Sequence, residues 1–233
     1  MKAKKAVIFI VEGITDKISL GSITSRLSRD RDIRFYIMNG DVTSDGATNR
    51  KNAVDKMTSR INRYCRDNFL KRSDIERIVH LVDADGAYIE DKHIERAKAG
   101  GLRYTTKHIY AKSVKYVAER NEKKRDIMDV LSACPSILGI SYRVYYFSCN
   151  LEHVLHKEIS MQDRRKKRKA EEFADRYYKR EEDFLDFIND PEFAVPGSYS
   201  QTWESIRQER NSLNRYRNFH LYFERSGFNS FRN

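Results

Sequence analysis

Acidic side chains directly follow two apolar segments of the sequence. Glu12 comes after the run 6–11 (AVIFIV), and Asp83 and Asp85 come after the mainly apolar run 78–82. Runs of this kind are typical of strands that are buried on both faces of a parallel sheet. Carboxylates gathered at the ends of neighbouring strands would repel one another unless a cation neutralised them. Because carboxylate oxygens are preferred ligands of Mg²⁺, the pattern predicts a magnesium site.

The predicted chemistry of such a site is the hydrolysis of a phosphodiester. One or two divalent ions held by carboxylates neutralise a phosphate and lower the pKa of an attacking water. The sequence contains no Gly-x-x-x-x-Gly-Lys-Ser/Thr loop for a nucleotide. A phosphatase or nucleotide hydrolase acting on small molecules is therefore the more distant alternative.

Strands and helices are expected to alternate along most of the chain. The periodicity of apolar residues predicts strands at 6–11, 33–38, 78–82 and 142–147, and helices that begin near residue 14 and at 51–70 and 126–132. This order predicts an α/β fold with an open, mainly parallel sheet flanked by helices. In such sheets the site lies at the carboxyl ends of the strands. Residues 88–125 give weak signals and are interpreted as an insertion.

Three further polar residues could join the site. Glu152 follows the strand at 142–147 and is either a metal ligand or a favourable partner for a helix dipole. Asp16 lies one helical turn after Glu12, where it would assist metal binding or cap a helix. His153 is a candidate proton donor or phosphate contact, although a purely structural role is the more common one for such a histidine.

The segments 11–16 (VEGITD) and 82–86 (VDADG) resemble the paired signatures of the Toprim fold. Topoisomerases, primases, OLD-family nucleases and small ribosomal-RNA maturases share this fold. The resemblance implies that Glu12 is a general acid or base, or a metal ligand, and that Asp83 and Asp85 coordinate magnesium.

The resemblance extends less firmly beyond these two motifs. Gly13 matches the motif glycine, where a missing Cβ lets the chain turn tightly. The pair Asn39-Gly40 stands where the fold usually has a glycine. Some Toprim nucleases have one more acidic metal ligand after the next strand, and Glu152 is the candidate for it. The resemblance covers about residues 5 to 90 well, and continues to about 160 mainly by alternation of elements.

The charge balance indicates a polyanionic partner. The chain has 45 Lys and Arg against 34 Asp and Glu, which gives a net charge of +11. A basic run is predicted to contact nucleic acid, or else forms a solvated helical face; its members are Arg164, Arg165, Lys166, Lys167, Arg168 and Lys169. We expect a catalytic domain at 1–160 and a basic, aromatic-rich, mainly helical extension at 161–233. Aromatic residues of the extension would stack on bases or cover a core.

These observations lead to one leading hypothesis and one alternative. The leading hypothesis is a Mg²⁺- or Mn²⁺-dependent nuclease that cleaves RNA or DNA, and the resemblance implies RNA processing or defence against phages and plasmids. It also implies an ATPase regulatory partner or a homo-oligomer. The alternative is a non-catalytic nucleic-acid-binding module, or a subunit of a larger complex, that binds magnesium for structure. No apolar run reaches the roughly 18 residues of a membrane span, so a cytoplasmic protein without a membrane partner is expected.

Overall fold

The computed structural model describes residues 4–38, 42–43, 45–98 and 100–225, and all structural statements below refer to these residues. The pair Asn39-Gly40, where the resemblance places a glycine, lies outside them. None of the described helices has both the length and the apolar composition needed to cross a bilayer.

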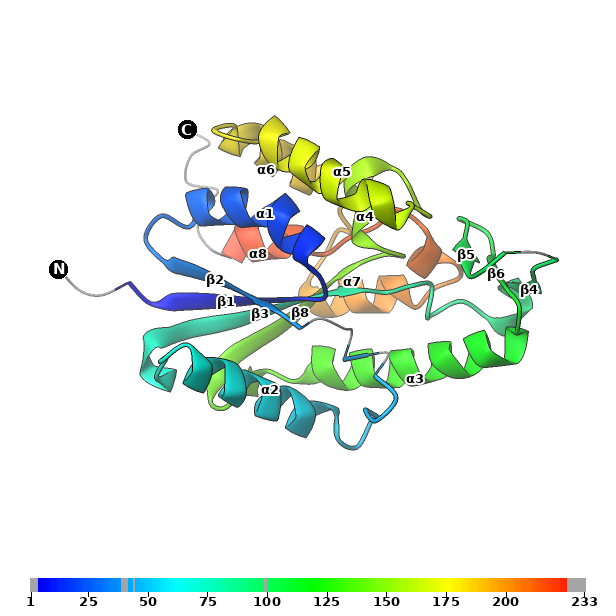
Figure 1. The fold of residues 1–233 in the computed structure, drawn as a ribbon, viewed down its shortest axis with the longest axis horizontal. Coiled ribbons are helices and arrows are strands. Elements are labelled where there is room, and N and C mark those ends of the chain that lie inside the picture. Colours follow the sequence, from blue (N-terminus) through cyan, green and yellow to red (C-terminus); the bar gives the residue numbers. More distant parts are fainter. Residues whose placement is uncertain (1–3, 39–41, 44, 99, 226–233) are drawn as a thin grey trace.

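A five-stranded, mostly parallel sheet forms the centre of the molecule (Figure 1). Its strand order is β2-β1-β3-β8-β7, and the strands are β1 (Ala6–Val11), β2 (Asp32–Ile37), β3 (Ile75–Asp83), β7 (Ser136–Ile137) and β8 (Ile140–Phe147). The four longer strands are parallel, and the short edge strand β7 is antiparallel to β8. The expected α/β class with a mainly parallel sheet is therefore confirmed.

Helices cover both faces of the sheet (Figure 1). One face packs against α2 (Ala53–Asp67), α3 (Val114–Ala133) and α7 (Tyr199–Ile206). The other face packs against α1 (Ile14–Leu27), α4 (Leu151–His156), α5 (Asp163–Arg176), α6 (Glu181–Asn189) and α8 (His220–Arg225). β1 is completely buried between these layers, which explains its uninterrupted apolar sequence.

The aromatic residues of the C-terminal third belong mainly to the core. Phe173, Phe184 and Phe219 are almost completely buried, and Phe219 packs edge-on against Phe9 of β1 and Tyr145 of β8. The sequence left open whether these rings stack on bases or cover a core, and the structure shows that they cover the sheet. Apolar residues between positions 173 and 223 thus share one buried cluster with apolar residues between positions 7 and 155. The domain boundary at residue 160 stays a prediction.

The segment expected to be an insertion forms a small second sheet and the start of a long helix. The sheet has the order β4-β6-β5, with β4 at Ile94–Arg96, β5 at Arg103–Tyr104 and β6 at Ile109–Ala111. Single-turn 3₁₀ helices lie at Arg72–Asp74, Asp91–His93 and Asn211–Leu213. The predicted helix at 126–132 was too short, because it is the last part of the 20-residue α3.

Candidate functional site

The carboxyl ends of β1, β3 and β8 meet at one edge of the sheet. The backbone N–H of Asp83 donates a hydrogen bond to Glu12 Oε1 at 3.2 Å. The Asp83 carboxylate in turn accepts a hydrogen bond from the backbone N–H of Leu151 at 2.9 Å. The structure therefore brings together the segments that carry Glu12, Asp83 and Glu152, which the sequence predicted to meet.

Backbone hydrogen bonds and a left-handed turn fix the loop that carries Asp85. The N–H groups of Ala84 and Asp85 donate to the carbonyls of Phe147 and Cys149, at 3.0 and 2.7 Å. Asp85 has φ of +50° and Gly86 has φ of +67°. Aspartate tolerates this conformation better than most residues because its short polar side chain bonds locally, and glycine tolerates it because it lacks a Cβ. The turn directs the chain away from the sheet edge immediately after the two acidic residues.

A buried lysine of α3 binds the second acidic residue of the pair. Lys124 Nζ lies 2.6 Å from Asp85 Oδ2, and the lysine side chain is 0% exposed against 24% for the aspartate. Arg120, one turn earlier on α3, donates to the Asp85 carbonyl at 3.0 Å and to the Tyr104 hydroxyl at 2.8 Å. Sequence reasoning identified neither cation as part of the site.

Glu152 lies in the first turn of α4, beside a lysine from α5. The Asn150 side chain caps this helix by accepting a hydrogen bond from the His153 N–H at 2.8 Å. Lys166 Nζ lies 3.2 Å from Glu152 Oε1, and the glutamate side chain is only 12% exposed. Both roles considered for Glu152 are therefore compatible with its position, since it occupies a helix start and faces the other carboxylates.

Asp16 caps helix α1 and also lies near other carboxylates of the site. Its Oδ2 accepts a hydrogen bond from the backbone N–H of Gly13, the N-cap residue of α1, at 3.0 Å. Burial raises the pKa of Asp16 to about 6, although the bond from Gly13 opposes this, and the negative charge of Glu152 adds to the rise. The negative charges of Asp16 and Glu152 thus repel each other within the same site.

Asp83 lies at the centre of the acidic cluster, which consists of Glu12, Asp16, Asp83, Asp85 and Glu152. Burial raises the pKa of Asp83 well above its usual range, and the charges of Glu12, Glu152, Asp16 and Asp85 raise it further, in that order. Crowding of this kind makes the ionised form unfavourable unless positive charge is nearby. The cluster is therefore a place where a cation would bind favourably.

The donor atoms of the acidic cluster fit a hard divalent cation by their chemistry. All are carboxylate oxygens, which suit Mg²⁺ or Mn²⁺. Within the described ranges, however, no three or more His, Cys, Asp or Glu side chains lie in positions that could hold a metal ion together. Two of the five carboxylates instead contact Lys124 and Lys166. A metal bound here would require the carboxylate side chains to move closer together.

The ring of His153 contacts the C-terminal segment. It is buried, bonds to the Asn214 backbone and lies near Arg215. Burial, assisted by the Arg215 charge, lowers the pKa of His153 to about 4, so the ring is neutral near pH 7. These contacts show a packing role, and an auxiliary role at the site stays a prediction.

Acidic neighbours compensate most of the basic run on α5. Arg165 pairs with Glu158, Lys167 with Glu171, and both Arg168 and Lys169 with Glu172, at 2.7 to 3.8 Å. Arg164 is exposed and donates to Gln162. Lys166 is the member of the run that reaches the acidic cluster. Contact of the whole run with nucleic acid stays a prediction.

A scan against protein-family models and searches of curated proteins and of solved structures found no match to this chain. The family implied by residues 11–16 and 82–86 therefore stays a prediction. The fold class and the acidic cluster rest on the geometry described above.

Proposed function

We propose that the protein is a metal-dependent nuclease that hydrolyses phosphodiester bonds of RNA or DNA. The observation that carries this proposal is the acidic cluster around Asp83, where burial and four neighbouring carboxylates raise the pKa of one aspartate. A buried concentration of negative charge is unfavourable for folding and is retained where it serves a site. Its place at the carboxyl ends of parallel strands is the usual place of a site in this fold class.

Glu12, Asp83, Asp85 and Glu152 are the residues that would hold Mg²⁺ or Mn²⁺. When bound, such an ion neutralises the scissile phosphate and lowers the pKa of the attacking water. Glu12 is the proposed base for that water. Lys124 holds the Asp85 carboxylate in place, and Lys166 supplies positive charge where a phosphodiester backbone would approach.

The net charge of +11 supports a polyanionic substrate. The resemblance of the two acidic motifs to Toprim signatures supports strand cleavage as the reaction. By that resemblance we also propose a cellular role in defence against phages and plasmids or in RNA processing, with an ATPase partner or a second copy of the chain as regulator.

The decisive experiment compares the wild type with Glu12→Gln on mixed cellular RNA and on plasmid DNA, with Mg²⁺, Mn²⁺ or EDTA. Glutamine retains the acceptor oxygen for the Asp83 N–H, so the fold should persist. We expect the substitution to lower cleavage by about 100-fold or more, and EDTA to abolish it. The exposed Glu119→Gln on α3 is the matched control. Equal cleavage by Glu12→Gln and the wild type would show that the assigned site is wrong.

A non-catalytic nucleic-acid-binding module is the second candidate. It is favoured by the two lysines that already neutralise Asp85 and Glu152, because these pairs stabilise the cluster without a metal. Binding of RNA or DNA in a gel-shift assay, with no cleavage at any metal concentration, would support this function over the nuclease.

A further inference from the structure

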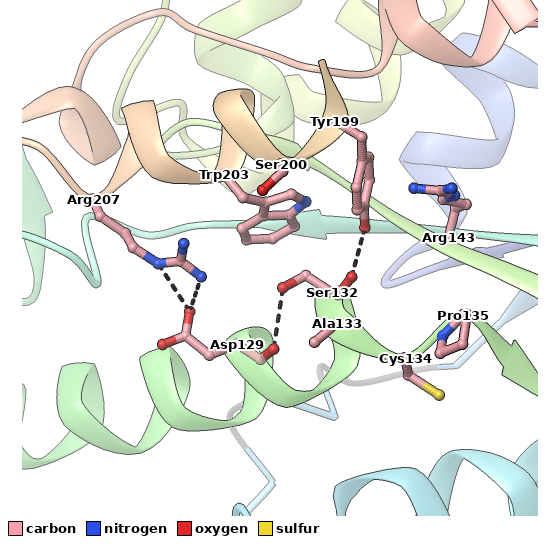
Figure 2. A pocket seen from close by; sticks show the side chains of 10 residues that line it. All are labelled: Asp129, Ser132, Ala133, Cys134, Pro135, Arg143, Tyr199, Ser200, Trp203 and Arg207. Atoms are coloured by element: carbon pink, nitrogen blue, oxygen red, sulfur yellow. Dashed lines mark hydrogen bonds and ion pairs between the residues drawn. The ribbon is translucent and has the colours of Figure 1, made fainter. Parts of the chain in front are cut away.

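A cavity lies away from the acidic cluster, between the end of α3 and the helix α7. Its volume is about 330 Å³, which is within the size range of small-molecule sites. Figure 2 shows Tyr199 and Trp203 of α7 on one side and the segment from Ser132 to Pro135 on the other, with Arg207 and Arg143 at opposite ends. Arg143 comes from β8, four residues before the strand ends at Phe147.

The two arginines of this cavity differ in how their charge is compensated. Arg207 Nη2 lies 2.7 Å from Asp129 Oδ1, so its charge is paired. Arg143 makes no ion pair within the described ranges, and its guanidinium lies 4.4 Å from the centre of the Tyr199 ring. Packing on an aromatic face holds a guanidinium in place while its N–H groups remain able to bind an anion. The Arg143 end of the cavity therefore has a positive charge that no carboxylate of the described residues pairs.

Trp203 forms part of the aromatic wall of the cavity. Its side chain is 3% exposed, and its ring packs edge-on against Tyr146 with centroids 5.1 Å apart. The indole Nε1 has no hydrogen-bond partner among the described residues. This nitrogen has almost no exposed surface, so Trp203 contributes an aromatic wall to the cavity and no hydrogen bond to a ligand.

The C-terminal end of α3 borders this cavity, and its carbonyl groups would repel an anion if they were free of hydrogen bonds. Free carbonyls at a helix C-terminus attract cations. Here the Asp129 carbonyl accepts a hydrogen bond from Ser132 Oγ at 3.2 Å, and the Tyr199 hydroxyl lies 3.2 Å from the Ser132 carbonyl and 2.9 Å from the Val144 carbonyl. A ligand would thus meet the aromatic walls, the Arg143 charge and, at the other end, the Arg207–Asp129 ion pair.

From these contacts we propose that the cavity binds a small organic anion that has a planar ring and an anionic oxygen group. The ring would lie along the aromatic wall formed by Tyr199 and Trp203, and the oxygens would accept hydrogen bonds from Arg143. A nucleoside monophosphate and an aromatic carboxylate share this chemistry. The inference does not depend on the nuclease proposal, because the cavity shares no residue with the acidic cluster.

The test uses the full chain in EDTA, so that metal binding at the acidic cluster does not contribute. Adenosine monophosphate and benzoate are titrated by calorimetry and by the fluorescence of Trp203, which is the only tryptophan in the sequence. We expect at least one of the two probes to bind with a Kd of about 1 mM or tighter. Arg143→Gln should weaken that binding by about tenfold or more. Trp203→Phe, measured by calorimetry, should weaken it less than Arg143→Gln does, because phenylalanine keeps an aromatic wall at this position.

The controls separate this site from nonspecific binding. Arg63→Gln, at an exposed position on α2, should leave binding unchanged. Adenosine and inorganic phosphate should each bind more weakly than adenosine monophosphate, because each lacks one of the two recognised groups. Far-ultraviolet circular dichroism should show that Arg143→Gln is folded. The proposal is overturned if neither probe binds, if Arg143→Gln binds as the wild type does, or if Arg63→Gln weakens binding equally.

Discussion

Lys124 places its ammonium 2.6 Å from the carboxylate of Asp85, and no part of the lysine side chain is exposed to solvent. Removing one member of a buried ion pair leaves the other charge without its partner. We therefore expect Lys124→Met to lower the free energy of unfolding by about 3 kcal/mol in urea denaturation. Lys115→Met on the same helix should change it by less than about 0.5 kcal/mol, because its pair with Glu119 is exposed. Equal effects of the two substitutions would contradict the structural role of Lys124.

Asp83→Asn should stabilise the protein while removing its activity. Asparagine still offers an oxygen to the Leu151 N–H, but it lacks the charge that four neighbouring carboxylates repel. In EDTA we expect the free energy of unfolding to rise by about 1 kcal/mol. Mg²⁺ should raise the melting temperature of the wild type and leave that of the variant unchanged. The exposed Asp67→Asn serves as control, and a loss of stability in Asp83→Asn would argue against charge crowding.

Lys166 should matter more than its neighbours in the basic run. It reaches Glu152, whereas Lys167 points to Glu171 on the solvent side of α5. We expect Lys166→Gln to lower nuclease activity by about tenfold, as for the loss of a charged contact to a phosphate. Lys167→Gln should lower it less than about twofold, as for a screened surface charge. Initial rates on the same substrate measure both, and equal losses would indicate a diffuse basic surface instead of a specific contact.

Gly86 should not tolerate a side chain. Its φ is +67°, and a Cβ built there would lie 2.5 Å from Leu213 Cδ2. Backbone strain and overpacking together predict that Gly86→Ala lowers the free energy of unfolding by about 2 to 4 kcal/mol. A Cβ at Gly46 would meet no atom within 4 Å. Gly46→Ala should therefore stay within about 0.5 kcal/mol of the wild type, and a comparable loss there would contradict the packing argument.

His220 should make stability depend on pH in the acid range. Burial, together with the nearby Arg217 charge, lowers its pKa from 6.5 to about 4. The unfolded chain binds the proton more readily, so this contribution to stability is complete above about pH 6.5 and is lost as the pH falls towards 4. The loss amounts to at most about 3 kcal/mol. Urea denaturation at several pH values should show a weaker dependence for His220→Gln; an unchanged dependence would mean that other groups cause it.

The sequence pattern located the strands that carry the acidic residues, and it explains why Glu12 and Asp83 meet. Both follow long apolar runs, and these runs form neighbouring parallel strands. The pattern missed the full length of α3 because two of its buried positions are polar, namely Asn121 and Lys124. Lys124 is buried because it pairs with Asp85, and this partner is 39 residues away in the chain. The periodicity of apolar residues along a helix does not predict an ion pair between residues so far apart in the chain.

The local hydrophobic pattern also did not predict the contacts that the C-terminal segment makes with the rest of the chain. The N–H of Tyr88, just after the second acidic motif, donates to Ser212 Oγ across 124 residues of sequence. Arg143 and Trp203, which line the cavity between α3 and α7, are also far apart in sequence. Composition predicted a helical, aromatic-rich extension, but the partners of each aromatic residue depend on the tertiary packing of the whole chain.

The hydrogen bonds at the end of β8 also have a consequence for biosynthesis. The N–H groups of Ser148 and Cys149 donate to the carbonyls of Tyr216 and Ser212, both at 2.8 Å. During translation the strands β1 to β8 leave the ribosome before residues 212–216 are made. The nascent chain can pair its parallel strands early, but the backbone N–H groups at this edge receive these acceptors only when residues 212–216 are made. The acidic cluster therefore reaches its final arrangement only after residues 212–216 have been synthesised.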